Sequence, residues 1–316
     1  MIHQPFSIDQ IQDLDYIAIV GPTGVGKSGY AIQLAQQYPN RFEIVSVDSV
    51  QVYRGLDIGS AKVDSATRKD IKHHLIDICD ADARYTAAQF ATDAIKAVGD
   101  IRQRGKTALL VGGTFLYLQA FTEGLSPVDP VTDQARAKVA EIHTRGVAMA
   151  WHTLNQVDPM TAKRLAPQDW CRIERALLVY YSTNQPISMW QAKPRRRGHN
   201  YQGTTLAVWP KDRAVLKENL AMRFDHMLDH GLIDEVKQCW DKYPKLTVDH
   251  PSMRAIGYRQ VSAYVQGKCD YTKMRHDGIV ATRRYCKRQL TWLRSMQNIH
   301  TSFTDPKQWD KFWGLC

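Results

Sequence analysis

The fold of this chain is decided by one stretch, Gly21-Pro22-Thr23-Gly24-Val25-Gly26-Lys27-Ser28. It fits G-x-x-x-x-G-K-[ST], the pattern of a phosphate-binding loop. The apolar residues 16–20 before it predict a buried strand, and residues 30–35 after it predict a helix, which is the context that such a loop needs. The sequence therefore predicts a binding site for a di- or triphosphate at the end of a first strand.

The residue types in this loop suit an anion. Glycines let the backbone turn so that successive N–H groups converge on one point, and the N-terminus of the following helix adds partial positive charge. Lys27 places an ammonium on the terminal phosphate, and Ser28 offers a hydroxyl to Mg²⁺. The loop predicts what is bound, and leaves open what is done to it.

The composition predicts a cytoplasmic α/β protein. A chain of 316 residues is long enough for one or two domains with a large core, and strand-like and helix-like segments alternate along it. None of its six cysteines forms a C-x-x-C pair, so we expect reduced thiols and neither a zinc site nor a disulfide framework. Residues 1–5 contain no apolar signal core, and no run of 18 apolar residues occurs.

The positive charge is unevenly distributed along the chain. Residues 1–128 carry a net charge of −2, residues 129–200 carry +5 and residues 201–316 carry +7. A kinase of a small metabolite needs no extended basic surface outside its phosphate loop. A polyanionic partner would explain such a surface, although solvation by lysine and arginine is a common alternative.

Two further strands are predicted to end beside the loop. Residues 42–47 form the first of them and lead into Asp48, where open α/β sheets bind ligands, although aspartate is also a common helix cap. Residues 107–111 follow a predicted helix at 86–104 and lead into Gly112-Gly113-Thr114. Many phosphate-loop ATPases have an aspartate there to hold Mg²⁺, so its absence argues against an ATP-driven motor.

The middle of the chain predicts a helical insertion at residues 129–200. Residues 133–155 look helical, Asp158-Pro159 opens a further helix, and Asp169 caps a helix at 170–181. Residues 193–198 are basic and rich in helix breakers, which predicts a mobile linker. We therefore expect a sheet core of the P-loop NTPase type, with helices on both faces, made of residues 1–128 and 201–316.

The C-terminal part predicts a basic helical surface. A strand at 206–209 is followed by a helix at 216–229 that carries Arg223, with Gly231 suited to its C-terminal cap. A long helix at 274–295 carries like charges four residues apart, which is easier to understand if phosphates lie against it. We expect Trp292 in the core, and the pair His73-His74 in a positioning or packing role, because no further zinc ligand has suitable spacing.

Taken together, these motifs resemble the tRNA dimethylallyltransferase family, also called tRNA isopentenyltransferases. The matching stretches occur in the family's order and span nearly the whole chain: 21–28, 48–62, 73–77, 111–117, 124–127, 255–260 and 282–289. The phosphate loop is shared with many families, whereas the stretches 48–62 and 282–289 are far more specific. Two departures are Asn184, where the family usually has glycine, and the extension at residues 1–14.

The resemblance implies an activity. A dimethylallyl group would pass from dimethylallyl diphosphate to N6 of adenine 37, beside the anticodon, in tRNAs that read codons starting with U. Diphosphate would leave with the help of Mg²⁺, and the enzyme would be a monomer that grips the tRNA anticodon stem-loop. An adenine stacked in that loop must be flipped out to reach a buried diphosphate.

The resemblance also assigns roles to individual residues. The loop 21–28 binds the diphosphate, with Lys27 foremost and Mg²⁺ held through Ser28; Thr23 contacts the bridging or leaving oxygen, and Arg223 is a second diphosphate clamp. Asp48 is the expected general base. The residues that match the family's tRNA-contacting positions are Asp48, Ser49, Val50, Gln51, Thr114, Arg136, Arg172, Arg175, Arg254, Ala255, Ile256, Gly257, Tyr258, Arg259, Lys287, Arg288, Gln289, Leu290, Thr291, Trp292, Leu293 and Arg294.

Three alternatives remain open at this point. A phosphate-loop kinase of a small metabolite explains the loop and the sheet, but not the basic insertion and basic final helix. A prenyltransferase of free adenine nucleotides shares the core chemistry, and only the basic charge argues against it. A non-catalytic RNA-binding protein with a vestigial loop conflicts with the intact Lys27, Ser28 and Asp48.

Overall fold

The computed structural model describes residues 13–195 and 197–314. It divides the chain into two compact units, a larger one up to Thr122 and from Gly198 onward, and a smaller one at Glu123–Arg197. The smaller unit thus begins and ends earlier than the insertion expected at 129–200. Most of the expected N-terminal extension, residues 1–12, lies outside the described residues.

The larger unit contains a six-stranded sheet in which every pairing is parallel, in the order β3-β2-β4-β1-β5-β6. This confirms the predicted α/β class with a P-loop-like sheet. The strands are β1 (Tyr16–Val20), β2 (Phe42–Val47), β3 (His73–His74), β4 (Thr107–Gly112), β5 (Gly203–Val208) and β6 (Thr301–Phe303). β6 escaped prediction because three residues carry no periodic pattern.

Three central strands end at the same level. Val20, the last residue of β1, is paired with Gly112 of β4, and Gly112 is in turn paired with Val47 of β2. The segments that follow these strands therefore leave the sheet side by side, although they lie far apart in the sequence. The phosphate loop, Asp48 and Gly113 all begin at this edge.

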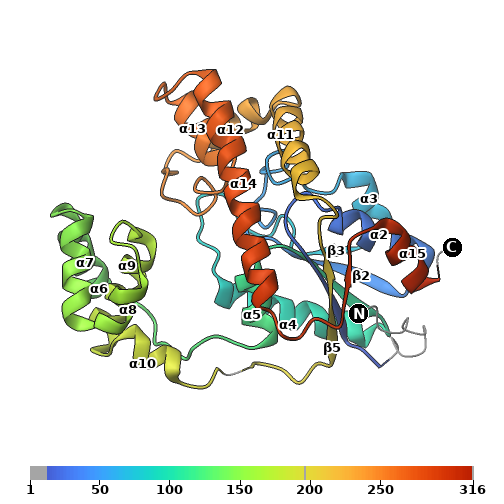
Figure 1. Ribbon diagram of the computed structural model, residues 1–316, viewed down its shortest axis with the longest axis horizontal. Helices are drawn as coiled ribbons and strands as arrows, with labels where there is room; N and C mark the ends of the chain where they lie inside the picture. The colour runs from blue at the N-terminus through green and yellow to red at the C-terminus, as the bar shows by residue number, and fades with distance from the viewer. Residues whose placement is uncertain (1–12, 196, 315–316) are drawn as a thin grey trace. The chain divides into compact units, whose positions relative to one another are not determined.

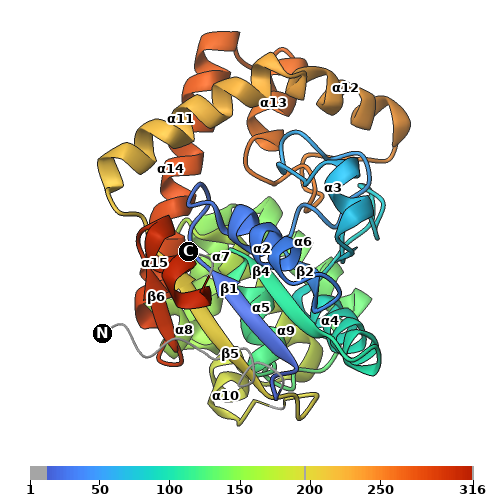
Figure 2. The ribbon, with the colours of Figure 1, turned by 90° about the vertical axis from the view of Figure 1, so that its right-hand side faces the viewer.

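Helices cover both faces of the sheet, as Figures 1 and 2 show. The helices that pack on the sheet are α2 (Lys27–Gln37), α4 (Ala87–Gln103), α5 (Phe115–Thr122) and α15 (Pro306–Trp313), whereas α3 (Ser65–Asp70) buries no side chain and precedes the edge strand β3. Ala18 of β1 belongs to a buried cluster with Phe90 of α4, whereas its neighbours Ile17 and Ile19 pack with Leu34 of α2. Alternating residues of a strand face opposite sides, so one strand supports both layers.

Four more helices form a second layer of the larger unit. They are α11 (Arg213–Asp229), α12 (Leu232–Lys242), α13 (Tyr258–Val265) and α14 (Tyr271–Ser295). Gly231, with φ 96°, follows α11 as predicted and also starts α12. Their apolar side chains form a core with Val52, Tyr53 and Leu56, so the segment after β2 packs against these helices.

The smaller unit is helical and has its own apolar core. Its helices are α6 (Asp133–Thr144), α7 (Val147–Val157), α8 (Pro159–Arg164), α9 (Trp170–Thr183) and α10 (Ile187–Ala192). The helical stretch predicted at 133–155 is two helices, because Gly146 adopts φ 96° between them. The caps at Asp158 and Asp169 are confirmed, since each side chain accepts a backbone N–H of the helix it opens.

Several smaller expectations are settled by the structure. Trp292 is 37% exposed and stacks on Phe115, so it is not a core residue. His74 Nε2 lies 2.7 Å from Glu43 Oε2, which agrees with the expected positioning role. The described part of the predicted linker at 193–198 lacks helix and strand, and Arg196 lies outside the description. No described helix is long and apolar enough to cross a membrane.

Asn184 generates a stability prediction. It ends α9 in the left-handed conformation, with φ 52°, which asparagine adopts at a lower energetic cost than alanine. We expect Asn184→Ala to lower the free energy of unfolding by about 1 kcal/mol, and Asn184→Gly to leave it unchanged or raise it. Urea unfolding followed by tryptophan fluorescence measures both; equal stability of the alanine variant and the parent would contradict the assignment.

Candidate active site

A cavity of about 580 Å³ lies in the larger unit, at the edge where β1, β2 and β4 end. The phosphate loop contributes Thr23 and residues 26–29 to its wall, and Asp48 lines it from the end of β2. Helices α11 and α14 contribute further residues, among them Arg223 and Arg288. The loop, the predicted base and the second predicted clamp thus line one space.

The first turn of α2 places backbone N–H groups that lack intrahelical partners at the wall of this cavity. Gly26 takes φ 85° at the start of α2, a conformation that favours glycine. α2 begins at Lys27, earlier than the predicted residue 30, so Lys27 and Ser28 occupy its first turn. The unpaired N–H groups of this turn, with the partial charge of the helix end, make a site for an anion.

Lys27 is the principal cation of the loop. Its Nζ donates a hydrogen bond to the carbonyl oxygen of Pro22 over 2.6 Å. Burial, partly offset by the charge of Asp48 and reinforced by repulsion from Arg223, lowers the pKa of Lys27 to about 8. An anion in the cavity would favour the charged ammonium.

Asp48 occupies a tight turn at the end of β2. Its Oδ1 accepts hydrogen bonds from the backbone N–H groups of Val50 at 2.8 Å and Gln51 at 3.2 Å. Asp48 therefore caps a turn, not the short helix that was one of its two predicted roles. Its charge also acts on Lys27 and Arg223 across the cavity.

The ends of β2 and β4 are joined by a side chain predicted to contact tRNA. Thr114 Oγ1 accepts a hydrogen bond from the backbone N–H of Ser49 at 3.2 Å. The pairing of Val47 with Gly112 brings these segments together. The structure therefore places Thr114, Ser49 and Asp48 in one group.

Three tyrosines in the cavity wall escaped sequence prediction: Tyr85, Tyr117 and Tyr285. Burial, reinforced by the charge of Asp48, raises the pKa of Tyr285 to about 12, so its phenol stays neutral. The cavity is also lined by apolar side chains of α11, namely Leu220, Phe224 and Met227. Tyr117 and Tyr285 fall inside the family-matching stretches 111–117 and 282–289, and this match was their only sequence signal.

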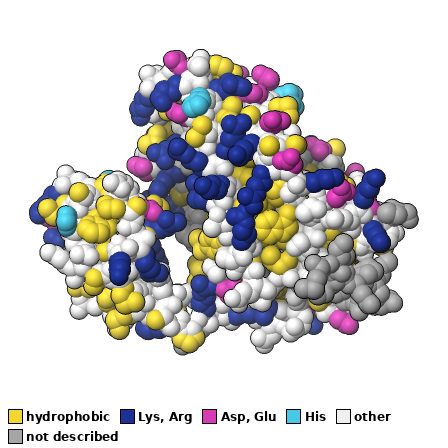
Figure 3. Space-filling view, viewed as in Figure 1, with side chains coloured by type: hydrophobic (Ala, Val, Ile, Leu, Met, Phe, Trp, Pro, Cys, Tyr) yellow, Lys and Arg dark blue, Asp and Glu magenta, His cyan; other side chains and the backbone are white. Residues whose placement is uncertain are grey.

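The segments 254–259 and 287–294 contribute to the cavity unequally. Arg254, Ala255, Ile256 and Gly257 line it, as do Arg288 and Gln289. Arg259, Lys287, Thr291 and Arg294 are exposed. Figure 3 shows lysine and arginine side chains gathered over α14.

Three side chains in these segments offer no surface to a nucleic acid. Tyr258 and Leu293 are fully buried, and Leu290 is nearly so. Tyr258 instead donates a hydrogen bond to Glu235 at 2.6 Å, and the two leucines pack into apolar clusters. These side chains support the exposed residues from beneath, and contact with tRNA at the three positions stays a prediction for their backbone.

The predicted tRNA contacts of the smaller unit lie on two packed helices. Arg136 is on α6, and Arg172 and Arg175 are on α9. Burial and repulsion by Arg136 lower the pKa of Arg175. Arg172 forms an ion pair of 2.5 Å with Asp169, whereas the Arg136–Asp133 separation of 3.9 Å is long.

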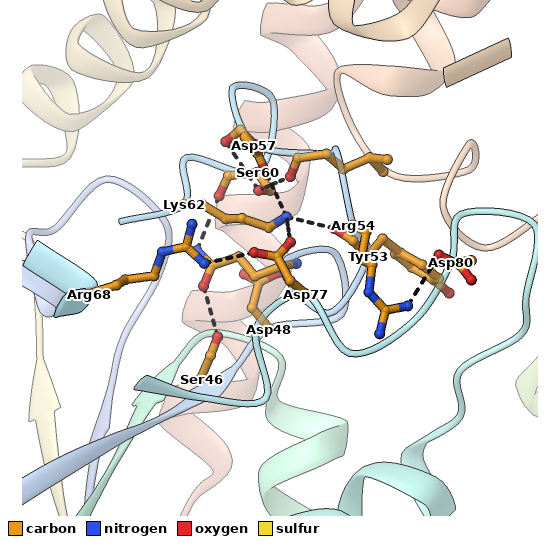
Figure 4. A network of polar contacts seen from close by, with 12 residues as sticks. Ser46, Asp48, Tyr53, Arg54, Asp57, Ser60, Lys62, Arg68, Asp77 and Asp80 are labelled. Carbon is orange, nitrogen blue, oxygen red and sulfur yellow. Dashed lines mark hydrogen bonds and ion pairs between the residues drawn. The ribbon is translucent and has the colours of Figure 1, made fainter. Parts of the chain in front are cut away.

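The segment that begins at Asp48 is held by a buried ammonium (Figure 4). The side chain of Lys62 is 2% exposed, and its Nζ donates to the carbonyl oxygen of Tyr53 at 2.6 Å. It also pairs with Asp57 at 2.6 Å and Asp77 at 2.5 Å. This one cation ties the end of the stretch 48–62 to its middle and to the neighbouring loop at Asp77.

A second tie comes from Glu235 of α12. Its carboxylate accepts hydrogen bonds from the consecutive backbone N–H groups of Asp57, Ile58 and Gly59, at 2.7, 2.7 and 3.1 Å. It also accepts the hydroxyl of Tyr258. Sequence reasoning missed Glu235, because a single glutamate on a helix forms no motif.

The parallel sheet, the loop after β1 and the cation-lined cavity define a P-loop protein that binds a phosphorylated substrate. A family model described as "IPP transferase" matches residues 51–296. The chain is 44% identical to a tRNA dimethylallyltransferase of Nitrosomonas eutropha, with 90% of this chain and 89% of that protein aligned. It is 47% identical to one of Burkholderia cenocepacia, with 88% and 86% aligned.

Solved structures agree with the sequence relatives. A full-length tRNA isopentenylpyrophosphate transferase of Bacillus halodurans superimposes with a TM-score of 0.66 at 32% identity, covering 94% of each chain. A eukaryotic dimethylallyltransferase acting on tRNA gives a TM-score of 0.74 at 29% identity, covering 95% of this chain and 76% of that one. The chain therefore belongs to the tRNA dimethylallyltransferase family.

The contribution of the Lys62 contacts can be tested by measuring the free energy of unfolding. Lys62→Met keeps the apolar stem but leaves Asp57, Asp77 and the Tyr53 carbonyl without their shared donor. We expect it to lower the free energy of unfolding by about 2 kcal/mol. Lys96→Met, which removes an exposed ion pair with Asp100, is the control and should change it by less than about 0.5 kcal/mol. Equal effects in urea unfolding would exclude a special role for Lys62.

Proposed function

We propose that this enzyme transfers a dimethylallyl group from dimethylallyl diphosphate to N6 of adenine 37 of tRNAs that read codons starting with U. Diphosphate is released. The observation that carries the proposal is the shared cavity, in which Lys27 and the phosphate loop face Asp48. The family membership supports the same reaction.

The loop and Arg223 serve the leaving group. When the allylic C–O bond breaks, its electron pair stays on the diphosphate, and positive charge develops on carbon. Preorganised cations and N–H groups stabilise such a transition state most effectively. Lys27, Arg223 and the residues of loop 21–28 supply them here, with the Thr23 hydroxyl on the leaving oxygen.

Asp48 serves the nucleophile. The N6 amine of adenine is weakly nucleophilic, because its lone pair is delocalised into the ring. As its nitrogen forms the new C–N bond it must lose one proton, and the Asp48 carboxylate takes it. The bonds from Val50 and Gln51 hold the carboxylate at the cavity edge. The neutral tyrosines and the apolar residues of α11 suit the dimethylallyl group.

Mg²⁺ is the proposed cofactor, and the residues present fit it. Ser28 presents a hydroxyl in the first turn of α2, beside Lys27, at the cavity wall. Mg²⁺ in such sites takes one or two protein oxygens and completes its shell with substrate phosphates and water. Bound there, it would neutralise charge on the diphosphate oxygens.

We propose that the basic residues hold the tRNA anticodon stem-loop while adenine 37 is flipped into the cavity. Arg254, Lys287, Arg288 and Arg294 of the larger unit carry this role, with Arg136, Arg172 and Arg175 of the smaller unit. The enzyme acts as a monomer, and its substrate places it in the cytoplasm.

A transfer assay tests the function and the base together. The protein is incubated with labelled dimethylallyl diphosphate, Mg²⁺ and either tRNA, AMP or ATP. We expect label on tRNA alone, at adenine 37. Asp48→Asn should reduce transfer at least about a thousandfold, because the amide cannot accept the proton.

The carboxamide oxygen of the Asp48→Asn variant can still accept the Val50 and Gln51 N–H groups, so the turn and tRNA affinity should survive. Label on AMP would favour a prenyltransferase of free nucleotides. Full activity of the asparagine variant would exclude Asp48 as the base, and lost tRNA affinity would point to a folding defect.

The pKa of Lys27 predicts a pH dependence of binding. In the free site burial lowers this pKa to about 8, whereas a bound diphosphate raises it. Ionisation of Lys27 should therefore cause no loss of affinity below a pH of about 8 and a loss of up to about tenfold per unit above it. Titration with dimethylallyl diphosphate in the absence of tRNA measures this. Lys27→Arg should bind without that decline; the same decline in the arginine variant would assign it to another group.

A further inference from the structure

Gln289 lies where an RNA-contacting side chain was expected, yet it is only 4% exposed. Both ends of its amide are used within the protein. Oε1 accepts the backbone N–H of Thr23 at 2.9 Å, and Nε2 donates to the carbonyl oxygen of Gly113 at 2.9 Å. One side chain on α14 thus joins the phosphate loop to the end of β4.

The amide has only one orientation that satisfies both contacts. The backbone N–H of Thr23 needs an acceptor, and the carbonyl of Gly113 needs a donor. A flipped amide would place two donors together at one end and two acceptors at the other. The side chain therefore sets the distance between Thr23 and Gly113, and it also requires a donor at one position and an acceptor at the other.

The atoms around this amide are closely packed. A Cβ added at Gly113 would lie 2.3 Å from Gln289 Nε2 and 3.1 Å from the carbonyl oxygen of Gly21. Glycine at position 113 lets helix α14, the phosphate loop and the end of β4 approach this closely. The ladder between β1 and β4 aligns Val20 with Gly112 but ends there, so it does not hold Thr23 or α14 in place.

We propose that Gln289 is a positioning residue for the diphosphate-binding loop and not a contact to RNA. By holding the backbone of Thr23 it fixes the loop whose N–H groups and Lys27 face the leaving group. This inference rests on the proposed function for the identity of the ligand. Gln289 acts through Thr23 and Gly113, and takes no part in the chemistry itself.

The expected size of the effect follows from geometry. A displacement of about 1 Å in a group that stabilises a transition state can reduce the rate about a hundredfold. A loosened loop should also bind the diphosphate less tightly in the ground state. Loss of Gln289 should therefore raise KM for dimethylallyl diphosphate and lower kcat, while tRNA affinity is kept.

Two substitutions separate the contacts. Gln289→Glu keeps size and the acceptor for Thr23, but sets a negative oxygen against the Gly113 carbonyl. Gln289→Met keeps most of the volume and removes both contacts. We expect at least a tenfold higher KM for dimethylallyl diphosphate in each, at least tenfold weaker binding of inorganic pyrophosphate with Mg²⁺, and tRNA affinity within twofold of the parent.

Arg294→Gln is the contrasting variant on the same helix. Arg294 is exposed and does not line the cavity. As a proposed tRNA contact, it should show weaker tRNA binding with an unchanged KM for dimethylallyl diphosphate. Gly113→Ala, which crowds the amide, should instead reproduce the Gln289 pattern.

The proposal is overturned if the Gln289 variants lose tRNA affinity with unchanged KM and pyrophosphate binding. A lower kcat with KM and pyrophosphate affinity unchanged also overturns it, since that is the signature of a partly unfolded sample. If Gln289→Met does not fold, the same measurements on Gln289→Glu and Gly113→Ala test the proposal. Pyrophosphate binding needs no tRNA, so it judges the positioning role even if the parent transfers nothing to tRNA and the proposed function fails.

Discussion

The site depends on the parallel alignment of β1, β2 and β4. Each strand alone delivers one element: the phosphate loop after Val20, the carboxylate of Asp48 after Val47, and the glycine pair at the end of β4. Backbone pairing brings the three to one level of the sheet, where the phosphate loop and Asp48 line one cavity. Parallel strands place all their carboxyl ends at one edge of the sheet. The fold itself therefore brings the segments after these strands close together, whatever side chains they carry.

Around this edge, polar side chains hold the backbone of the loops in position. Lys62, Glu235 and Gln289 each satisfy backbone groups from segments that have no regular pairing of their own. A backbone N–H or carbonyl in a buried loop needs a partner, and a side chain from a distant helix can provide it. The loops of the site are thus ordered by side-chain hydrogen bonds, of which those from Glu235 and Gln289 span long sequence separations, while the sheet is ordered by its own ladder.

Sequence patterns predicted the regular parts of the fold well. The apolar strands β1 and β2, the capped helices α4 and α9 and the phosphate loop all carry strong local signals, and the structure confirms them. β6, α12 and the break at Gly146 carry only weak local sequence signals. The role of Glu235 and the burial of Gln289 follow from packing between distant segments, which periodicity does not encode. The specific motifs located the cavity, but not which of their residues face it.

The sheet order has a consequence for how the chain is made. β1 lies between β4 and β5, and the whole smaller unit separates these two neighbours in the sequence. During synthesis, β1 can pair with β4 early, but its other edge stays open until the ribosome has finished the smaller unit. Contacts of such long sequence separation form slowly, and an unpaired strand edge invites aggregation. The nascent protein therefore exposes the edge of β1 that pairs with β5 until the residues of β5 have been made.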